Sequence, residues 1–244
     1  MAARTLLTLF LLLLSAAAVV ARKQSRNQPH GHSGKLQPYQ PGQFDVQLTS
    51  SERDILEKGG SIMKQSQKGT SGGAICVQDV QAPVQAVWHQ ILDLNGYSTK
   101  VSKVKECKNY HVSSKRDGTT TIKTKQVLGV LPGYSYESYY DHTFFPKHSS
   151  LTWTLDYDKT SDLDDCTGHW HVQRLDGNRT RVFYACDVVM KTAVPTPILN
   201  YISKAALKQA TAWVKKEAEL HPDRTVPPEF GRLPQELIVH GGQE

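Results

Sequence analysis

Apolar and polar positions alternate most strictly in the stretch LTWTLDY, residues 151–157. Leu151, Trp153, Leu155 and Tyr157 fall on one side of an extended chain, and the residues between them are Thr, Thr and Asp. A period of two predicts a half-buried strand whose aromatic side faces inward. Comparable runs predict further strands over 74–80, 102–113, 119–130, 134–144, 167–175 and 180–191. The short turns between most of them predict an antiparallel meander.

Two stretches follow the helical period instead. Apolar residues at i, i+3, i+4, i+7 and i+8 predict a helix over residues 84–96, directly after Ala82-Pro83. A long final helix is predicted from Pro195 or Pro197 to about residue 220. Its apolar stripe consists of Leu199, Ile202, Ala206, Ala210 and Trp213. A strongly twisted antiparallel sheet wrapped around this helix would bury both apolar surfaces, so the predicted fold class is α+β.

The rest of the chain divides around this pattern. Residues 22–45 are rich in Gln, Pro, Gly, His and Ser and predict a disordered linker. Residues 46–71 hold a short helix, with capping-box spacing at Thr49 and Glu52, and a glycine-rich lead-in. The regular domain is predicted over 72–220, and residues 221–244 are predicted to be a flexible tail.

Residues 1–21 have the pattern of a secretory signal peptide. Arg4 precedes an apolar run from Leu6 to Leu14, and small residues allow cleavage after Ala21. We therefore expect a protein that is secreted or resides in the lumen of the secretory pathway. An uncleaved signal anchor is the alternative, because the apolar run approaches the shortest membrane spans of roughly 17 residues.

Entry into the secretory pathway would affect the four cysteines and one possible glycosylation site. Cys76, Cys107, Cys166 and Cys186 could form zero or one disulfide, or serve as small buried side chains. The triplet Asn178-Arg179-Thr180 fits a glycosylation acceptor in a polar turn.

The net charge does little to distinguish between classes of function. The chain has 244 residues, 39% of them hydrophobic, which suits one substantial domain with tails, and its formal charge is +6. The lysines and arginines are scattered, which indicates solvated faces, and weak contact with anionic membranes is the alternative. No nucleic-acid-binding motif is present.

The inward sides of the predicted strands are unusually aromatic, whereas the final helix presents small alanines. These side chains could interdigitate as a solid core or line a cavity. Several phenols beside His142 favour a cavity for a partly polar ligand, because buried hydroxyls need hydrogen-bond partners. The candidate ligand-binding residues are Trp88, Tyr110, Tyr136, Tyr140, His142, Trp153, Leu155, Trp170, Tyr184, Ile202, Ala206 and Trp213.

Catalytic and metal motifs are weak. His169 and His171 fall on the face opposite Trp170, expected to be the wetter one, without an evident third ligand for a metal. The acidic loop with Asp162, Asp164 and Asp165 lacks the spacing of a calcium-binding EF-hand. We therefore predict no metal and no cofactor. His142 is the one candidate for acid–base catalysis, if the protein is an enzyme.

The sequence also resembles a known superfamily. Ala82-Pro83, Trp88, Asp93, Tyr97, Trp170 and Pro195 occur in the order and spacing found in START-like, or helix-grip, proteins of the polyketide cyclase/dehydrase and coenzyme Q-binding type. The resemblance covers about residues 72–218. It implies a curved antiparallel sheet around a long C-terminal helix, with a cavity between them that holds lipids, isoprenoids or aromatic polyketides. Relatives that bind coenzyme Q work in mitochondria, whereas this N-terminus is of the secretory type.

Three hypotheses about function follow. The first is binding, and possibly transport, of a hydrophobic small molecule or lipid without catalysis. The second is a polyketide cyclase, aromatase or dehydratase. The third is a peripheral membrane module that exchanges lipid. Neither the ligand nor the oligomeric state follows from the sequence.

Overall fold

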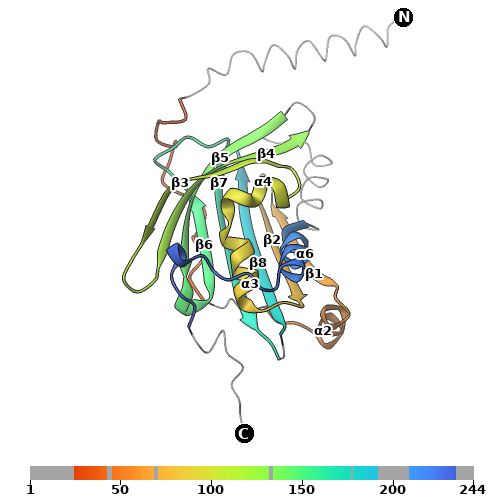
Figure 1. The fold of residues 1–244 in the computed structure, drawn as a ribbon. Helices are drawn as coiled ribbons and strands as arrows, with labels where there is room; N and C mark the ends of the chain where they lie inside the picture. The colour runs from red at the N-terminus through yellow and green to blue at the C-terminus, as the bar shows by residue number, and fades with distance from the viewer. Residues whose placement is uncertain are drawn as a thin grey trace, which may run out of the picture.

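One antiparallel sheet dominates the computed structural model, which describes residues 25–42, 46–68, 71–131, 134–176, 178–191 and 209–234. Its eight strands follow the spatial order β1-β2-β8-β7-β6-β5-β4-β3. In chain order they are β1 (Ser61–Lys68), β2 (Ser71–Val80), β3 (Val104–Ser114), β4 (Thr120–Leu131), β5 (Tyr134–Phe145), β6 (Ser150–Leu155), β7 (Leu163–Arg174) and β8 (Thr180–Met190). The sheet curls, so that β3, β4 and β5 run across the ends of the other strands (Figure 1).

The helices lie on both sides of the sheet. Helices α3 (Val84–Leu92), α4 (Tyr97–Lys100) and α6 (Ala212–Leu220) cover the concave face, whereas α2 (Ser50–Glu57) lies outside, beside β1 (Figure 1). Short 3-10 helices are η1 (Leu94–Gly96), η2 (Pro146–His148) and η3 (Pro228–Phe230). The capping box predicted at Thr49 is present, because its side chain accepts from the Glu52 amide and the Glu52 carboxylate accepts from the Thr49 amide.

The predicted α+β class with a curved antiparallel sheet is confirmed. Each predicted strand corresponds to one of β2 to β8, and β1 is an additional edge strand that sequence analysis placed in the lead-in. The predicted start of the final helix, near Pro195, lies outside the described residues, and α6 covers its C-terminal part. Among the described helices, none is long and apolar enough to cross a membrane.

The main core lies between α3, α6 and the concave face. Trp88, Ile91 and Leu151 are all fully buried there. The indole of Trp88 packs on Phe144, with ring centroids 4.8 Å apart, and donates to Ser149 Oγ over 3.1 Å. These contacts anchor α3 to the sheet and leave no free polar atom on the indole.

A second, smaller core covers part of the convex face. Leu56 of α2 is buried against Ile62, Val77 and Phe183, which point outward from β1, β2 and β8. This arrangement explains why α2, a short helix with one buried residue, lies at this edge of the sheet.

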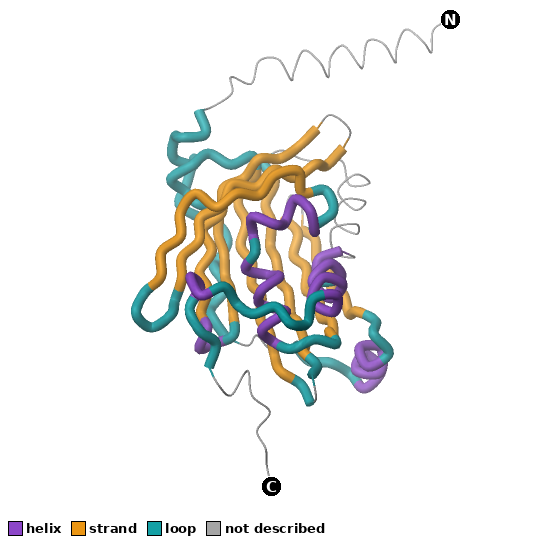
Figure 2. The backbone as a smooth tube through the Cα atoms, viewed as in Figure 1, coloured by secondary structure: helices purple, strands orange, loops and turns teal. Residues whose placement is uncertain are grey.

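Residues 25–42, which we call the N-terminal arm, correct the prediction of a disordered linker at 22–45. The arm has no helix or strand, yet it runs along the convex side of the sheet (Figure 2). Arg26 forms a bidentate pair with Asp162, with distances of 2.8 and 3.0 Å. Asp165 accepts from the backbone amides of Lys35 and Leu36 over 2.6 and 2.8 Å. Polar contacts thus order a segment that has almost no aliphatic side chains.

The described part of the predicted flexible tail is also structured. Residues 221–234 run from α6 across the open end of the concave face to η3 (Figure 1). Phe230 and Leu233 are buried in the main core. Ser114 Oγ donates to the carbonyl of Glu229 over 2.7 Å. This segment therefore belongs to the domain.

Candidate functional site

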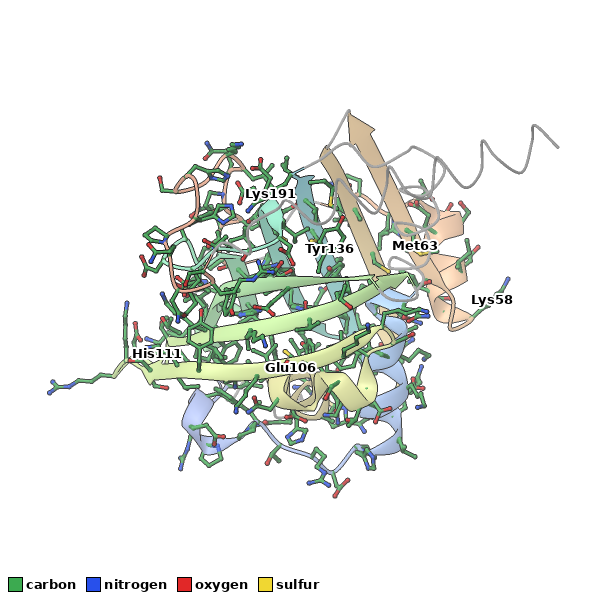
Figure 3. The ribbon with its side chains drawn as sticks, turned by 90° about the horizontal axis from the view of Figure 1, so that it is seen from above. Lys58, Met63, Glu106, His111, Tyr136 and Lys191 are labelled. Carbon is green, nitrogen blue, oxygen red and sulfur yellow. The ribbon has the colours of Figure 1, made fainter. Side chains whose placement is uncertain are left out.

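The centre of the concave face brings together six of the predicted ligand-binding residues. They are Tyr140, His142, Trp153, Leu155, Trp170 and Tyr184. The strand register places Tyr140 opposite Leu155 and His142 opposite Trp153 across β5 and β6, and Trp170 opposite Tyr184 across β7 and β8. Tyr136 has the same parity on β5 and lies opposite Leu128 near the start of that strand (Figure 3). Alternation along the strands thus predicted most of this surface.

His142 is the most polar group at this centre. Its Nδ1 lies 3.2 Å from the carbonyl oxygen of Ile122 and 3.0 Å from Thr124 Oγ1. A carbonyl only accepts, so the proton belongs on Nδ1 and Nε2 carries the lone pair. Burial lowers the pKa of His142 to about 4. The imidazole is therefore neutral near pH 7 and presents Nε2 as an acceptor.

Further hydroxyl groups lie on the same face of the sheet. Ser138 follows the same parity on β5 and is 3% exposed, and its Oγ makes no close hydrogen bond among the described residues and interacts with the Tyr140 phenol. Burial raises the pKa of both Tyr140 and Tyr184 well above the usual value, so both phenols stay protonated. The centre of the concave face therefore offers hydroxyl donors and one imidazole acceptor among aromatic rings.

The indole of Trp153 forms part of this surface, and Gly168 on the neighbouring strand makes its position possible. A Cβ placed on Gly168 of β7 would lie 2.0 Å from Trp153 Cζ2. The indole therefore lies flat over the neighbouring strand, where any other residue would displace it. The same ring approaches His142 and Tyr184, with centroids 6.0 and 5.8 Å away.

Two cysteines lie beside this indole, one opposite Gly168 and the other in contact with Trp153. Cys166 and Cys186 project from β7 and β8 with their Sγ atoms 3.8 Å apart, and both are free thiols. They were not among the predicted site residues. Their parity, shared with Trp170 and Tyr184, was the signal that could have identified them.

Other predicted ligand-binding residues lie elsewhere. Trp88 of α3 is fully buried in the main core. Trp213 of α6 packs against Tyr97 and Trp170, with ring centroids 4.8 and 6.4 Å apart, and so joins the helices to the sheet. Ile202 and Ala206 lie outside the described residues.

Tyr110 was wrongly assigned to the inner face. Irregular pairing in β3 between Val104 and Glu106 shifts the register, so that Asn109 lies opposite Thr124 and Tyr110 points to the convex face. Its hydroxyl donates to Asp156 over 2.5 Å. There it lines a depression of about 300 Å³ together with Lys108, Asn109, Lys125, Tyr139 and Lys159.

Tyr157 also departs from the predicted alternation. The strand β6 ends at Leu155, and Tyr157 lies in the following turn, where its hydroxyl donates to Asp165 over 2.7 Å. Leu151, Trp153 and Leu155 are buried as predicted.

The convex face of β7 is buried, although the sequence predicted that it would be the wetter face. His169 and His171 are 0% and 8% exposed, and the ring of Tyr39 from the N-terminal arm lies 5.9 Å from that of His169. Burial lowers the pKa of both imidazoles, that of His169 to about 4. Asn178 is exposed in the turn between β7 and β8.

Structural comparison identifies the fold. No protein-family model and no curated protein matches the chain. Its structure is similar to that of the Zhui aromatase/cyclase from Streptomyces sp. R1128, with 17% identity, coverage of 66% of this chain and 96% of that one, and a TM-score of 0.51. A START superfamily protein from Mycobacterium smegmatis has 15% identity, coverage of 66% and 97%, and a TM-score of 0.48. A major latex-like protein from Panax ginseng has 12% identity, coverage of 63% and 98%, and a TM-score of 0.41. The chain has a START-like, helix-grip fold.

Proposed function

We propose that this START-like domain binds a hydrophobic molecule that carries at least one polar oxygen, against the centre of its concave face. The observation that carries the proposal is the buried Ser138 Oγ, which makes no close hydrogen bond among the described residues and lies on the same face of β5 as Tyr140 and His142. A buried hydroxyl without a partner costs about 1–3 kcal/mol. A ligand oxygen would recover this energy.

The aromatic wall supports the apolar part of this ligand. Trp153, Trp170 and Tyr184 form a continuous set of ring contacts, with Trp170 and Tyr184 centroids 4.6 Å apart. Flat aromatic or isoprenoid surfaces pack well on such rings, and each Å² of apolar surface removed from water contributes roughly 25 cal/mol. Lipids, isoprenoids and aromatic polyketides share this combination of apolar body and polar oxygen.

A dye-binding assay tests the proposed face. Tyr140 and Tyr139 are neighbours on β5 that point to the concave and convex faces. We expect Tyr140→Ala to weaken binding of the apolar dye anilinonaphthalene sulfonate about tenfold, the loss of one buried aromatic contact of about 1.4 kcal/mol. Tyr139→Ala should bind like the parent chain. Equal effects of both variants, with unchanged circular dichroism, would overturn the assignment of the ligand to this face.

Catalysis by His142 is the second candidate, suggested by the aromatase/cyclase with the same fold. A general acid or base works best with a pKa near the operating pH, whereas burial lowers the pKa of His142 to about 4. This group can accept a hydrogen bond but holds no proton on Nε2 to donate at neutral pH.

The variant His142→Gln, which keeps a polar side chain at this position, distinguishes catalysis from binding. Unchanged ligand affinity with complete loss of turnover of an aromatic polyketide would favour the enzyme; parallel weakening of ligand binding favours a binding protein.

We further propose that the protein acts in the secretory pathway, on the strength of residues 1–21. Expression in a eukaryotic secretory host should yield a mature chain beginning at Arg22. Membrane docking through the basic helix faces has less support, because Lys215 and Lys216 of α6 pair with Glu219 and Glu217. Salt-insensitive or absent binding to anionic vesicles would remove that alternative.

A further inference from the structure

The N-terminal arm brings two histidines to the start of β7. His30 and His32 lie beside Asp164, with one potential ligand atom of each residue within 4.8 Å of the others. The two imidazole centroids are 4.9 Å apart. The motif His-Gly-His lies in the segment that composition alone marks as a linker, and Asp164 lies more than a hundred residues away in the acidic loop. Only the fold reveals this juxtaposition.

We propose that His30, His32 and Asp164 form a binding site for a divalent transition metal, with Zn²⁺ as its best fit. Two imidazoles and one carboxylate are a common protein ligand set for zinc, with water as the fourth ligand. Tetrahedral bonds of about 2.0–2.1 Å place neighbouring ligand atoms about 3.3 Å apart. The distance from His32 Nε2 to Asp164 Oδ1 is 3.5 Å, which fits that edge and is too long for a good hydrogen bond.

His32 supplies a potential ligand atom that no hydrogen bond occupies. His32 Nε2 is buried and has no hydrogen-bond partner within the described ranges.

The surrounding contacts orient the ligands. Lys35 Nζ binds Asp164 Oδ2 over 2.7 Å and thereby leaves Oδ1 facing His32. His30 Nε2 donates to the carbonyl of Asp164 over 2.8 Å, the kind of backbone contact that fixes ligand imidazoles, so Nδ1 is the ligand atom and would replace its long 3.4 Å contact with the Ser161 amide. The Gly34 amide donates to His32 Nδ1 over 3.0 Å. A metal on Nε2 moves the proton to Nδ1, so this amide must turn away.

Metal binding would fasten the N-terminal arm to the sheet. Two ligands come from the arm and one from β7, so the site exists only when the arm is in place. A ligand that binds only the folded state stabilises it in proportion to RT ln(1 + [L]/Kd). Saturating Zn²⁺ should therefore raise the melting temperature, and chelation should reverse the effect.

Metal titration of the full, untagged chain tests the proposal. Zn²⁺ binding is measured by competition with a chromophoric chelator, and Co²⁺ is used as a spectroscopic probe. We expect one Zn²⁺ per chain, and visible Co²⁺ absorption of a tetrahedral site without the thiolate charge-transfer bands that Cys166 and Cys186 would produce. His32→Ala and Asp164→Asn should each weaken Zn²⁺ binding by at least about tenfold, since even outer contacts of metal sites are worth that much.

His111→Ala is the matched control. This exposed histidine lies near the end of β3 and is not one of the three proposed ligands (Figure 3). It should leave both the affinity and the melting shift unchanged. Absence of Zn²⁺ binding by the parent chain would overturn the proposal, and so would undiminished binding by Asp164→Asn, whose side chain keeps the original shape and should fold.

Discussion

Two buried imidazoles, His142 and His169, connect single residues to the stability of the whole domain. Burial lowers the pKa of each to about 4, whereas an unfolded histidine titrates near 6.5. Between these values the unfolded chain binds protons that the native chain does not. Their contribution to stability is therefore complete above about pH 6.5 and is lost as the pH falls toward 4.

We expect the free energy of unfolding to fall by about 1.4 kcal/mol per pH unit for each such imidazole within this window. Urea denaturation at several pH values measures the slope. His142→Gln should reduce it by one imidazole's share, whereas His111→Gln, at an exposed position, should leave it unchanged. A slope that is the same in all three proteins would contradict the burial of His142.

Gly168 gives a second prediction for one residue. Its substitution by Ala would place Cβ inside the indole of Trp153, so the ring must move or the strand must shift. Such overpacking costs typically 1–3 kcal/mol. Chemical denaturation of Gly168→Ala should show a loss in this range, and the dye affinity of the concave face should change with it.

Gly31→Ala is the comparison for this substitution. A Cβ at Gly31 meets no atom within 4 Å, so its stability should match that of the parent chain. Equal stability of both variants would mean that Trp153 does not lie over β7.

Strand parity determined how well individual site residues could be predicted. Tyr140, His142 and Tyr184 belong to strands with regular pairing, and counting by twos places them correctly. Tyr110 follows a register shift in β3, between Val104 and Glu106, that the alternation of apolar residues does not mark. One irregular position reverses every later side chain of a strand. Ser138 was missed for another reason, since its importance depends on burial.

The N-terminal arm shows that the structure of a whole segment can also escape prediction from the sequence. Its composition predicts disorder, because it has few apolar side chains to bury. Arg26 and Lys35 nevertheless pair with Asp162 and Asp164, at the start of β7 and more than a hundred residues away. Local composition cannot reveal such complementarity between distant charges. The helices and strands with strong periodicity were predicted within a few residues, as α3 and β5 illustrate.

Asp165 tests whether the arm is an integral element. It is fully buried and accepts from the amides of Lys35 and Leu36 and from the Tyr157 hydroxyl. Asp165→Ala would leave these donors without a partner, at about 1–3 kcal/mol each if they stay buried. We expect faster hydrogen exchange at both amides and a lower unfolding free energy.

Asp158→Ala is the control for this element, because its side chain is 89% exposed. It should leave exchange in the arm unchanged. If the Lys35 and Leu36 amides already exchange at random-coil rates in the parent chain, the arm is not held as described.

At the scale of the whole molecule, the antiparallel meander and the concave aromatic face followed from sequence periodicity, and the START-like fold followed from resemblance. The way in which the segment after α6 closes the domain did not follow from the sequence. Phe230 and Leu233 complete the main core from a segment with no helical or strand period, so only their burial identifies them. The identity of the bound molecule depends on side-chain packing around Ser138 and His142, which alternation does not determine.

Native mass spectrometry of the chain purified from a eukaryotic secretory host tests the central claim most directly. We predict a bound apolar molecule with at least one oxygen, which is lost on denaturation and whose occupancy is reduced in Tyr140→Ala but not in Tyr139→Ala. A chain that carries no ligand and takes up none from a total lipid extract would contradict a binding function for the concave face.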